Sequence, residues 1–180
     1  MPDDKLVLHP VNARAILQDP AQLVEGLRKA GLVGPGFSHV GELHYRAGPR
    51  FRELVSFRSA TPADVGAYHV SVLETTERPT FLGASNALPP ECPRCGSKIA
   101  DWRKQLTVWQ NEGQRHPWSC AGCAGKVPVK DLRWGTTGGI GRFSVDLWNV
   151  APDEAAPTPE LLALLEHETL ETWRYFFYRF

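Results

Sequence analysis

The spacing of apolar positions predicts one helix near each end of the chain. Asp19 and Pro20 are typical of a helix start, because aspartate caps the first turn and proline fits the first helical position. Apolar residues follow at helical spacing as far as Gly31, so we expect a helix over about residues 20–30. Thr158 likewise precedes a leucine-rich stretch with helical spacing, which predicts a second helix directly after it.

Alternating apolar and polar positions predict strands elsewhere. In residues 143–150, Phe143 and two further apolar residues face one way, while Asp146 and Trp148 face the other. If this strand paired in parallel with the one expected after the second helix, the crossover would be right-handed. The same reasoning indicates strands within residues 37–57, 68–74, 81–83 and 173–180, whereas the first 18 residues carry no clear pattern. We therefore predict an α+β fold, with a mixed or antiparallel sheet and two or more helices.

Composition is ordinary for a globular protein. The 180 residues are 42% hydrophobic and carry no formal net charge, which fits one domain with or without a small appendage and does not suggest a generic polyanion binder. The acidic opening is not followed by an apolar targeting segment, and no apolar run reaches the roughly 18 residues of a membrane span. We therefore expect a cytoplasmic protein without a membrane partner, in a compartment that keeps thiols reduced.

All four cysteines stand in two C-x2-C pairs, and this pattern predicts one zinc ion held by Cys92, Cys95, Cys120 and Cys123. Four thiolates close the coordination sphere, so the expected role of the metal is structural. Rubredoxin-like iron would use the same four sulfurs and is the alternative metal. A thioredoxin-like redox pair at the first C-x2-C would need a helix starting there, which Pro93 and Gly96 oppose.

The cysteines also suggest how the chain is organised. We expect residues 91–134 to form an inserted ribbon, and residues 1–90 and 135–180 to form one α+β domain together. The 24 residues between the pairs exceed the usual ribbon spacing, which predicts an extended hairpin between the two knuckles. Glycine follows Cys95 directly but follows Cys123 only after one residue, so we expect differently shaped knuckles. The glycine-rich residues 135–141 lack the ending of a phosphate loop and are predicted to be a flexible connector.

The predicted ribbon is basic and rich in tryptophan. Residues 92–134 carry eight Lys or Arg against three Asp or Glu, while the rest of the chain carries twelve against seventeen. Exposed rings beside cations can stack on bases and contact phosphates, whereas buried rings would only pack the ribbon against the body. The candidate contact residues for a nucleic acid or another partner are Arg94, Lys98, Trp102, Arg103, Lys104, Trp109, Arg115, Trp118, Lys126, Lys130 and Arg133. On a strand, Trp102 and Trp109 would face opposite sides.

A second, weaker constellation lies in the predicted α+β domain. His39, Glu42 and His44 are close in sequence, and Glu42 and His44 would share one face of a strand. Such a set is compatible with a second metal site or an acid–base site. A partly buried polar edge of the sheet would give the same pattern.

Two resemblances follow from these residues. The segment around Cys92-Pro93-Arg94-Cys95-Gly96 resembles the zinc-ribbon class, which implies metal binding without implying a partner. The rest of the chain resembles a small group of uncharacterised bacterial proteins, and that resemblance implies no activity. It is carried by Gly141-Arg142-Phe143, Trp148-Asn149-Val150, Glu154-Ala155 and Trp173-Arg174-Tyr175-Phe176.

The sequence leaves three functions open. The first is a non-catalytic interaction module stabilised by zinc, with a protein partner, and the absence of a recognisable catalytic set favours it. The second is nucleic-acid binding through the basic ribbon. The third is an enzyme with a site in the α+β domain, where His39, Glu42 and His44 would be tested first.

Overall fold

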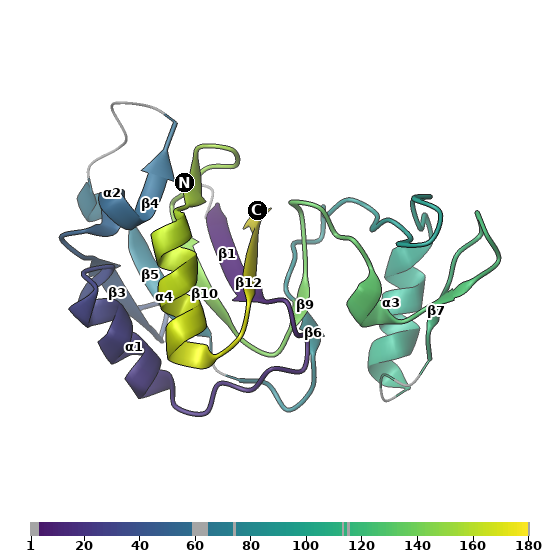
Figure 1. The fold of residues 1–180 in the computed structure, drawn as a ribbon, viewed down its shortest axis with the longest axis horizontal. Helices are drawn as coiled ribbons and strands as arrows, with labels where there is room; N and C mark the ends of the chain where they lie inside the picture. Colours follow the sequence, from purple (N-terminus) through teal and green to yellow (C-terminus); the bar gives the residue numbers. More distant parts are fainter. Residues whose placement is uncertain (1–3, 59–64, 74, 113, 115, 180) are drawn as a thin grey trace.

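The computed structural model of the chain describes residues 4–58, 65–73, 75–112, 114 and 116–179 (Figure 1). Its helices are α1 (Pro20–Lys29), α2 (Phe51–Leu54), α3 (Trp102–Asn111) and α4 (Pro159–Thr169), with short 3-10 helices at Val65–Ala67 and Val129–Asp131. Its strands are β1 (Lys5–Pro10), β2 (Val33–His39), β3 (Glu42–Ala47), β4 (Val55–Phe57), β5 (His69–Leu73), β6 (Thr80–Phe81), β7 (Trp118–Ser119), β8 (Lys126–Val127), β9 (Ile140–Gly141), β10 (Ser144–Trp148), β11 (Ala155–Pro157) and β12 (Trp173–Tyr178). Helices combined with antiparallel sheets confirm the predicted α+β class.

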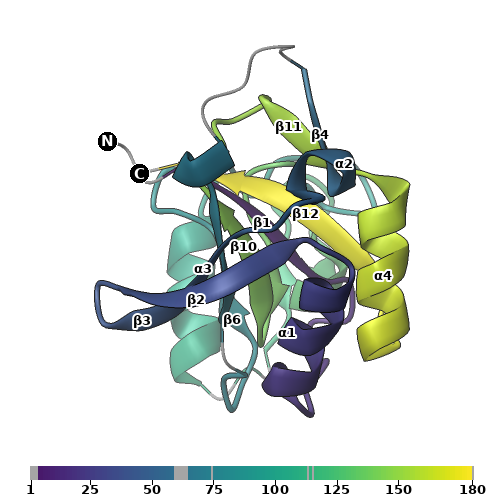
Figure 2. The ribbon, with the colours of Figure 1, turned by 90° about the vertical axis from the view of Figure 1, so that its left-hand side faces the viewer.

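The main sheet has six strands in the order β12-β1-β10-β5-β3-β2. All neighbouring strands in it are antiparallel. Helices α1 and α4 lie on the same side of this sheet (Figure 2). Leu27 and Leu165 from these helices share one hydrophobic core with Leu6 and Leu147 from the sheet. We call the other side of the main sheet the helix-free face.

Both predicted helices are confirmed, together with their caps. The Asp19 carboxylate accepts a hydrogen bond from the Gln22 amide at 3.0 Å, and α1 starts at the following proline. Gly31 has a φ of 82° just after the C-cap residue, a conformation that glycine adopts without a steric penalty. The Thr158 hydroxyl caps α4 by accepting from the Leu161 amide at 3.3 Å. Local capping chemistry thus sets where these helices begin.

Strand β1 is the main element that the sequence pattern missed. It lies between β10 and β12 in the sheet, and all six of its residues are buried. Because both faces of the strand are covered, its residues do not show the alternation of a half-exposed strand. Since β1 separates β10 from β12, these two strands do not pair, and the parallel crossover considered above does not occur.

The glycine-rich segment is not a loose connector in its second half. Gly138 and Gly139 are buried, and β9 follows them and pairs with β6. A Cβ atom placed on Gly138 would lie 2.9 Å from Cε2 of Phe81, which is closer than side chains normally approach. The expected flexibility of residues 135–141 therefore does not fit this packed part, where glycine permits close contact between segments.

Replacing Gly139 with alanine is expected to destabilise the fold by about 1–3 kcal/mol. A Cβ atom at this position would overlap the buried ring of His9, so the ring or the glycine segment must shift. Urea unfolding of the variant measures the loss. Gly34→Ala is the matched control, because its Cβ would meet only ordinary contacts at 3.5 Å. Equal stabilities for the two variants would contradict the prediction.

A second hydrophobic core draws mostly on residues 92–134 and lies to the right of the main sheet in Figure 1. Glu91 and Arg133 exchange backbone hydrogen bonds of 2.8 and 3.1 Å, which bring the two ends of this segment together. Ala13, Ala87 and Ile140 contribute to this core from outside the segment. We refer to residues 91–134 as the ribbon.

Candidate metal centre

The four cysteines converge on one point, as the sequence predicted. The Cys92 and Cys123 sulfurs lie 4.0 Å apart, and the Cys95 and Cys120 sulfurs lie 3.6 Å apart. All four sulfurs are within 4.8 Å of one another, which among the described residues is the one group of three or more potential ligands this close together. The sulfurs therefore stand at distances that suit a shared metal ion.

The first knuckle is shaped by backbone hydrogen bonds around its cysteines. The Cys92 amide donates to the Ser97 carbonyl, and the Gly96 amide donates to the Cys92 carbonyl, both at 2.9 Å. Gly96, directly after Cys95, has a φ of 72°, a left-handed conformation that glycine adopts without a steric penalty. This turn places Cys92 in the ribbon core and leaves Cys95 at the surface.

The second knuckle repeats this pattern with a different residue. The Cys120 amide donates to the Gly125 carbonyl at 3.0 Å, and Ala124 has a φ of 53°. Ala124 follows Cys123 directly and so takes the position that Gly96 has in the first knuckle. The expectation that the displaced Gly125 would reshape this knuckle is therefore wrong, because alanine adopts the left-handed conformation at a cost of about 1–2 kcal/mol.

Replacing Ala124 with glycine is therefore expected to stabilise the metal-bound protein by about 0.5–1 kcal/mol. Glycine removes the free-energy cost of the left-handed conformation in the folded state. Part of this gain is offset because glycine gives the unfolded chain more conformational entropy. Thermal unfolding compared with Ala121→Gly tests this, because Ala121 is also exposed but is not left-handed. The control should lower the melting temperature, and a similar decrease for Ala124→Gly would refute the strain argument.

The thiols differ in acidity when no metal is bound. Hydrogen bonds from the Ser97 side chain and backbone lower the pKa of Cys95 to about 6. The Gly125 amide favours the Cys123 thiolate, but burial and hydrogen bonds with the other three thiols outweigh it and raise the pKa of Cys123 to about 11. The Cys95 thiolate thus forms readily and opposes ionisation of Cys123. A cation placed between the sulfurs would remove this repulsion, and protonation of the thiolates in acid would release it.

A helix fills the long spacing between the two knuckles. Residues Trp102–Asn111 form α3, where the sequence analysis expected an extended hairpin. Residues seven apart lie on the same side of a helix, so Trp102 and Trp109 both face the ribbon core. The prediction that these two rings face opposite sides is therefore wrong.

The candidate contact residues divide clearly by burial. The tryptophans of the ribbon, at 102, 109, 118 and 134, are all buried and offer no exposed ring face for stacking. Arg94, Lys98, Arg103, Lys104, Lys126, Lys130 and Arg133 are exposed, whereas Arg115 lies outside the described residues. Arg103 also holds the ribbon in place, because its guanidinium donates to the Ser85 carbonyl at 2.6 Å and lies 4.4 Å from the centre of a Trp102 ring. The accessible chemistry of the ribbon is thus cationic.

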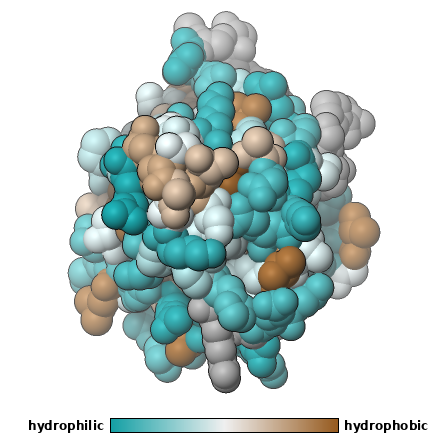
Figure 3. Space-filling view, turned by 90° about the vertical axis from the view of Figure 1, so that its right-hand side faces the viewer, coloured by the Kyte–Doolittle hydropathy of each residue, from teal (hydrophilic) through white to brown (hydrophobic). Residues whose placement is uncertain are grey.

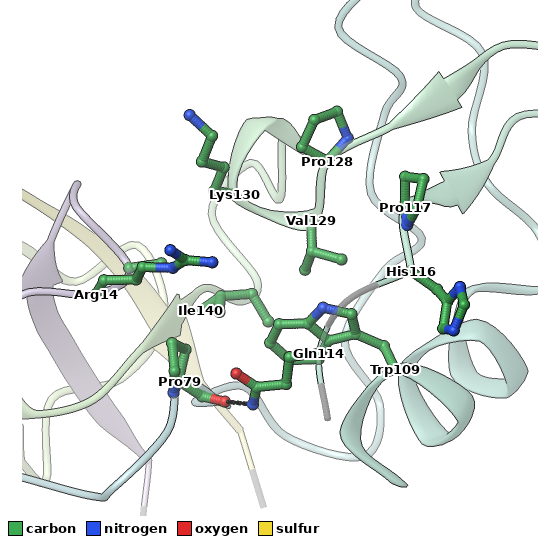
Figure 4. Close-up of a pocket in the computed structure, with 11 residues that line it drawn as sticks. Arg14, Pro79, Trp109, Gln114, His116, Pro117, Pro128, Val129, Lys130 and Ile140 are labelled. Atoms are coloured by element: carbon green, nitrogen blue, oxygen red, sulfur yellow. Dashed lines mark hydrogen bonds between the residues drawn. The ribbon is translucent and has the colours of Figure 1, made fainter. Parts of the chain in front are cut away.

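A cavity of about 250 Å³ lies where the ribbon meets the rest of the protein (Figure 4). Trp109, Val129 and Ile140 supply its apolar side chains, and Gln114 is tied to the Pro79 carbonyl. The described residues that line it include Arg14, Lys130 and His116 but no Asp or Glu. This cavity therefore combines apolar contact with positive charge. The rest of the surface on the side of the ribbon is mostly hydrophilic, with scattered hydrophobic side chains (Figure 3).

The second constellation is brought together on the helix-free face. The ring centres of His39 and His44 lie 4.9 Å apart, and a Glu42 oxygen is 3.8 Å from Nε2 of His44. His69, which the sequence pattern did not single out, joins them, and its Nδ1 lies 2.8 Å from Nδ1 of His44. His69 reaches this place only because β5 pairs with β3. The one clue in the sequence was that the strand predicted for residues 68–74 also carries a histidine. Burial and the neighbouring His39 lower the pKa of His44, which keeps its ring neutral at neutral pH.

Among the described residues, no helix combines the length and apolar character needed to cross a membrane. Comparisons of the chain with protein families, curated proteins and solved structures found no match. The converging cysteines are therefore the finding on which a functional assignment can be built.

Proposed function

We propose that the four cysteines bind one zinc ion with a structural role. The convergence of their sulfurs carries this proposal. Sulfurs placed about 2.3 Å from a tetrahedral zinc ion are about 3.8 Å from one another. The distances of 4.0 and 3.6 Å between opposite knuckles lie on either side of that value.

A structural role is supported by the coordination and by the packing of the ribbon. Four thiolates leave zinc no open position for a substrate or a water molecule. The ribbon core also contains three buried indole N–H groups, of Trp102, Trp118 and Trp134, that have no hydrogen-bond partner among the described residues. Such groups cost free energy on folding. A bound metal would offset this cost by cross-linking the two knuckles.

Elemental analysis of the purified protein tests the metal assignment. We expect one zinc ion per chain, retained through dialysis at neutral pH and lost at acidic pH as the thiolates are protonated. One iron ion per chain with a thiolate-to-iron absorption band would instead establish a rubredoxin-like centre. Protein without a bound metal, together with no uptake of added zinc, would refute both assignments.

We further propose that the zinc-held ribbon is a non-catalytic interaction module for an acidic segment of a partner protein. The exposed cations of the ribbon support this, as does the cavity beside Arg14 and Lys130. Its apolar lining at Trp109, Val129 and Ile140 suits a hydrophobic side chain next to an acidic one. This arrangement supplies both the buried contact and the charge complementarity that protein recognition uses.

An acidic peptide that alternates glutamate and leucine is a suitable probe for this cavity. Fluorescence anisotropy should show binding to the zinc-loaded protein that weakens as salt rises. Arg14→Ala and Lys130→Ala should weaken binding, whereas Lys29→Ala on α1, far from the cavity lining, should leave it unchanged. Equal binding by all variants, or equal binding of a lysine–leucine peptide, would contradict the proposal.

Nucleic-acid binding is the second candidate, favoured by the exposed cations. Because the tryptophans are buried, such binding would use phosphate contacts and show little base preference. A filter-binding assay with single-stranded RNA and DNA at low salt tests it, with Lys98→Ala and Lys104→Ala as variants and Lys29→Ala as the control. Retention that falls steeply with salt and with the ribbon substitutions would support this candidate, and no retention at low salt would eliminate it.

A further inference from the structure

Three imidazole rings meet on the helix-free face, well separated in sequence from the cysteines. His39 ends β2, His44 lies within β3 and His69 begins β5. Their ring centres form a nearly equilateral triangle with sides of 4.9, 5.0 and 4.9 Å. His44 and His69 are buried, and His39 is half-buried. Three imidazole rings gathered this closely have the composition of a transition-metal site.

We propose that His39, His44 and His69 form a second metal site, for zinc or a similar divalent transition-metal ion. The contact between His44 and His69 is the first step. Their Nδ1 atoms lie 2.8 Å apart, so one ring donates and the other accepts a hydrogen bond. When the donor ring moves its proton to Nε2, both Nδ1 atoms present lone pairs to the same point. A metal ion placed there would need only a small separation of the two rings.

The surroundings favour that tautomer. Nε2 of His44 lies on the other side of the ring from the Nδ1 pair and 3.8 Å from a Glu42 carboxylate oxygen, whose negative charge favours a proton on Nε2. A carboxylate behind a metal-bound histidine is a common outer-shell arrangement that orients the ring. Trp148 stacks on His69 with an interplanar angle of 8°, which fixes the plane of the second ring.

His39 supplies the third ligand after its ring turns. Among the described residues only the cysteines already place all their ligand atoms within 4.8 Å of one another, so the His39 nitrogens must move inward. Rotation about the bond between Cβ and the ring is soft, and this half-buried residue ends its strand. The rings also contact Phe37 and Trp148, which limits how far His44 and His69 can move.

The nearby charges permit a cation at this point. Lys5 forms an ion pair with the buried carboxylate of Asp146, which also interacts favourably with charge on His44. The Arg46 guanidinium lies over the Phe37 ring, 5.2 Å from its centre. Glu42 adds a negative charge beside His44. Because Asp146 is already paired with Lys5, Glu42 is the carboxylate beside the rings that can offset charge on a bound ion.

Titration of the zinc-loaded protein with Co²⁺ at neutral pH tests the second site. We expect one additional ion per chain with the weak absorption of nitrogen and oxygen ligands, and without the strong thiolate-to-cobalt band that exchange at the cysteines would produce. His44→Gln should abolish this binding, and His39→Gln should weaken it at least ten-fold. Glu42→Gln, at an exposed position, should weaken it by roughly 10–100-fold without unfolding the protein.

His116→Gln is the matched control, because His116 is exposed and lies 3.2 Å from Glu112 in an ion-pair contact just beyond the end of α3. Its Co²⁺ binding should equal that of the wild type. Absence of an additional ion would overturn the second site. An additional ion that is lost in His116→Gln, or that persists unchanged in both His39→Gln and Glu42→Gln, would overturn it as well. Because the readout excludes the thiolate band, these outcomes do not depend on the zinc assignment.

Discussion

Replacing Cys92 with serine is expected to abolish metal binding and unfold the ribbon while the main sheet stays folded. Cys92 is completely buried, and its sulfur is one of four that hold the two knuckles together. Structural zinc contributes about 10–16 kcal/mol of apparent binding free energy in zinc-finger peptides, and this free energy is lost with the ligand. Four of the six tryptophans are in the ribbon, so tryptophan fluorescence should shift strongly to the red.

Ala121→Ser is the control for this experiment. It introduces a hydroxyl group at an exposed position between Cys120 and Cys123 but removes no ligand. It should keep one metal ion per chain and the fluorescence of the wild type. Limited proteolysis should cut the Cys92→Ser variant between residues 91 and 134 and spare the rest. A Cys92→Ser protein with a full complement of metal and an uncut ribbon would contradict a four-cysteine site.

The protein is also expected to lose stability in acid because of His9. Burial, followed by the nearby Arg174, lowers the pKa of His9 from 6.5 to about 3. The folded state therefore holds this ring neutral, while the unfolded state protonates it below pH 6.5. The stability is fully present above that pH and is lost as the pH falls from 6.5 towards 3. The loss amounts to roughly 1.4 kcal/mol per pH unit, or about 2 kcal/mol at pH 5.

Urea unfolding of the wild type and of His9→Gln at several pH values isolates this effect. Glutamine cannot titrate, yet its amide can replace the bonds of the His9 ring with the Pro10 carbonyl and with Arg174. Metal release and other histidines affect both proteins alike, so the difference between them reports His9. The wild type should lose about 2 kcal/mol more than His9→Gln between pH 7 and pH 5. Parallel curves would show that His9 does not titrate as described.

Secondary structure was predictable where short-range chemistry decides it. The caps at Asp19 and Thr158 and the alternation around Asp146 act within a few residues, and the structure agrees with each. Strand β1 and helix α3 were missed for different reasons. The first lies between two other strands and is buried on both faces, and the second lies in a segment that was interpreted from the usual spacing of zinc ribbons.

The cysteine cluster was predictable because its signal is local and chemically specific. Two C-x2-C pairs each turn two sulfurs towards one point, so only the meeting of the two knuckles required the fold. The left-handed Ala124 could not be foreseen, because its conformation follows from the knuckle around it and not from the preference of alanine. The histidine cluster was predictable only in part. His39 and His44 lie in one hairpin and were identified from the sequence, whereas His69 lies in β5, which pairs with β3 only in the folded protein.

The sequence by itself thus determined the α+β class, the helix starts and the two pairs of metal-ligating cysteines, because each follows from the pattern of residues close in the chain. Only the tertiary structure decided that the ribbon tryptophans are buried, that glycine packs against His9 and that His69 joins His39 and His44. These features depend on which distant segments pack together. That choice is made by burial of the whole apolar surface, which no short stretch of sequence encodes.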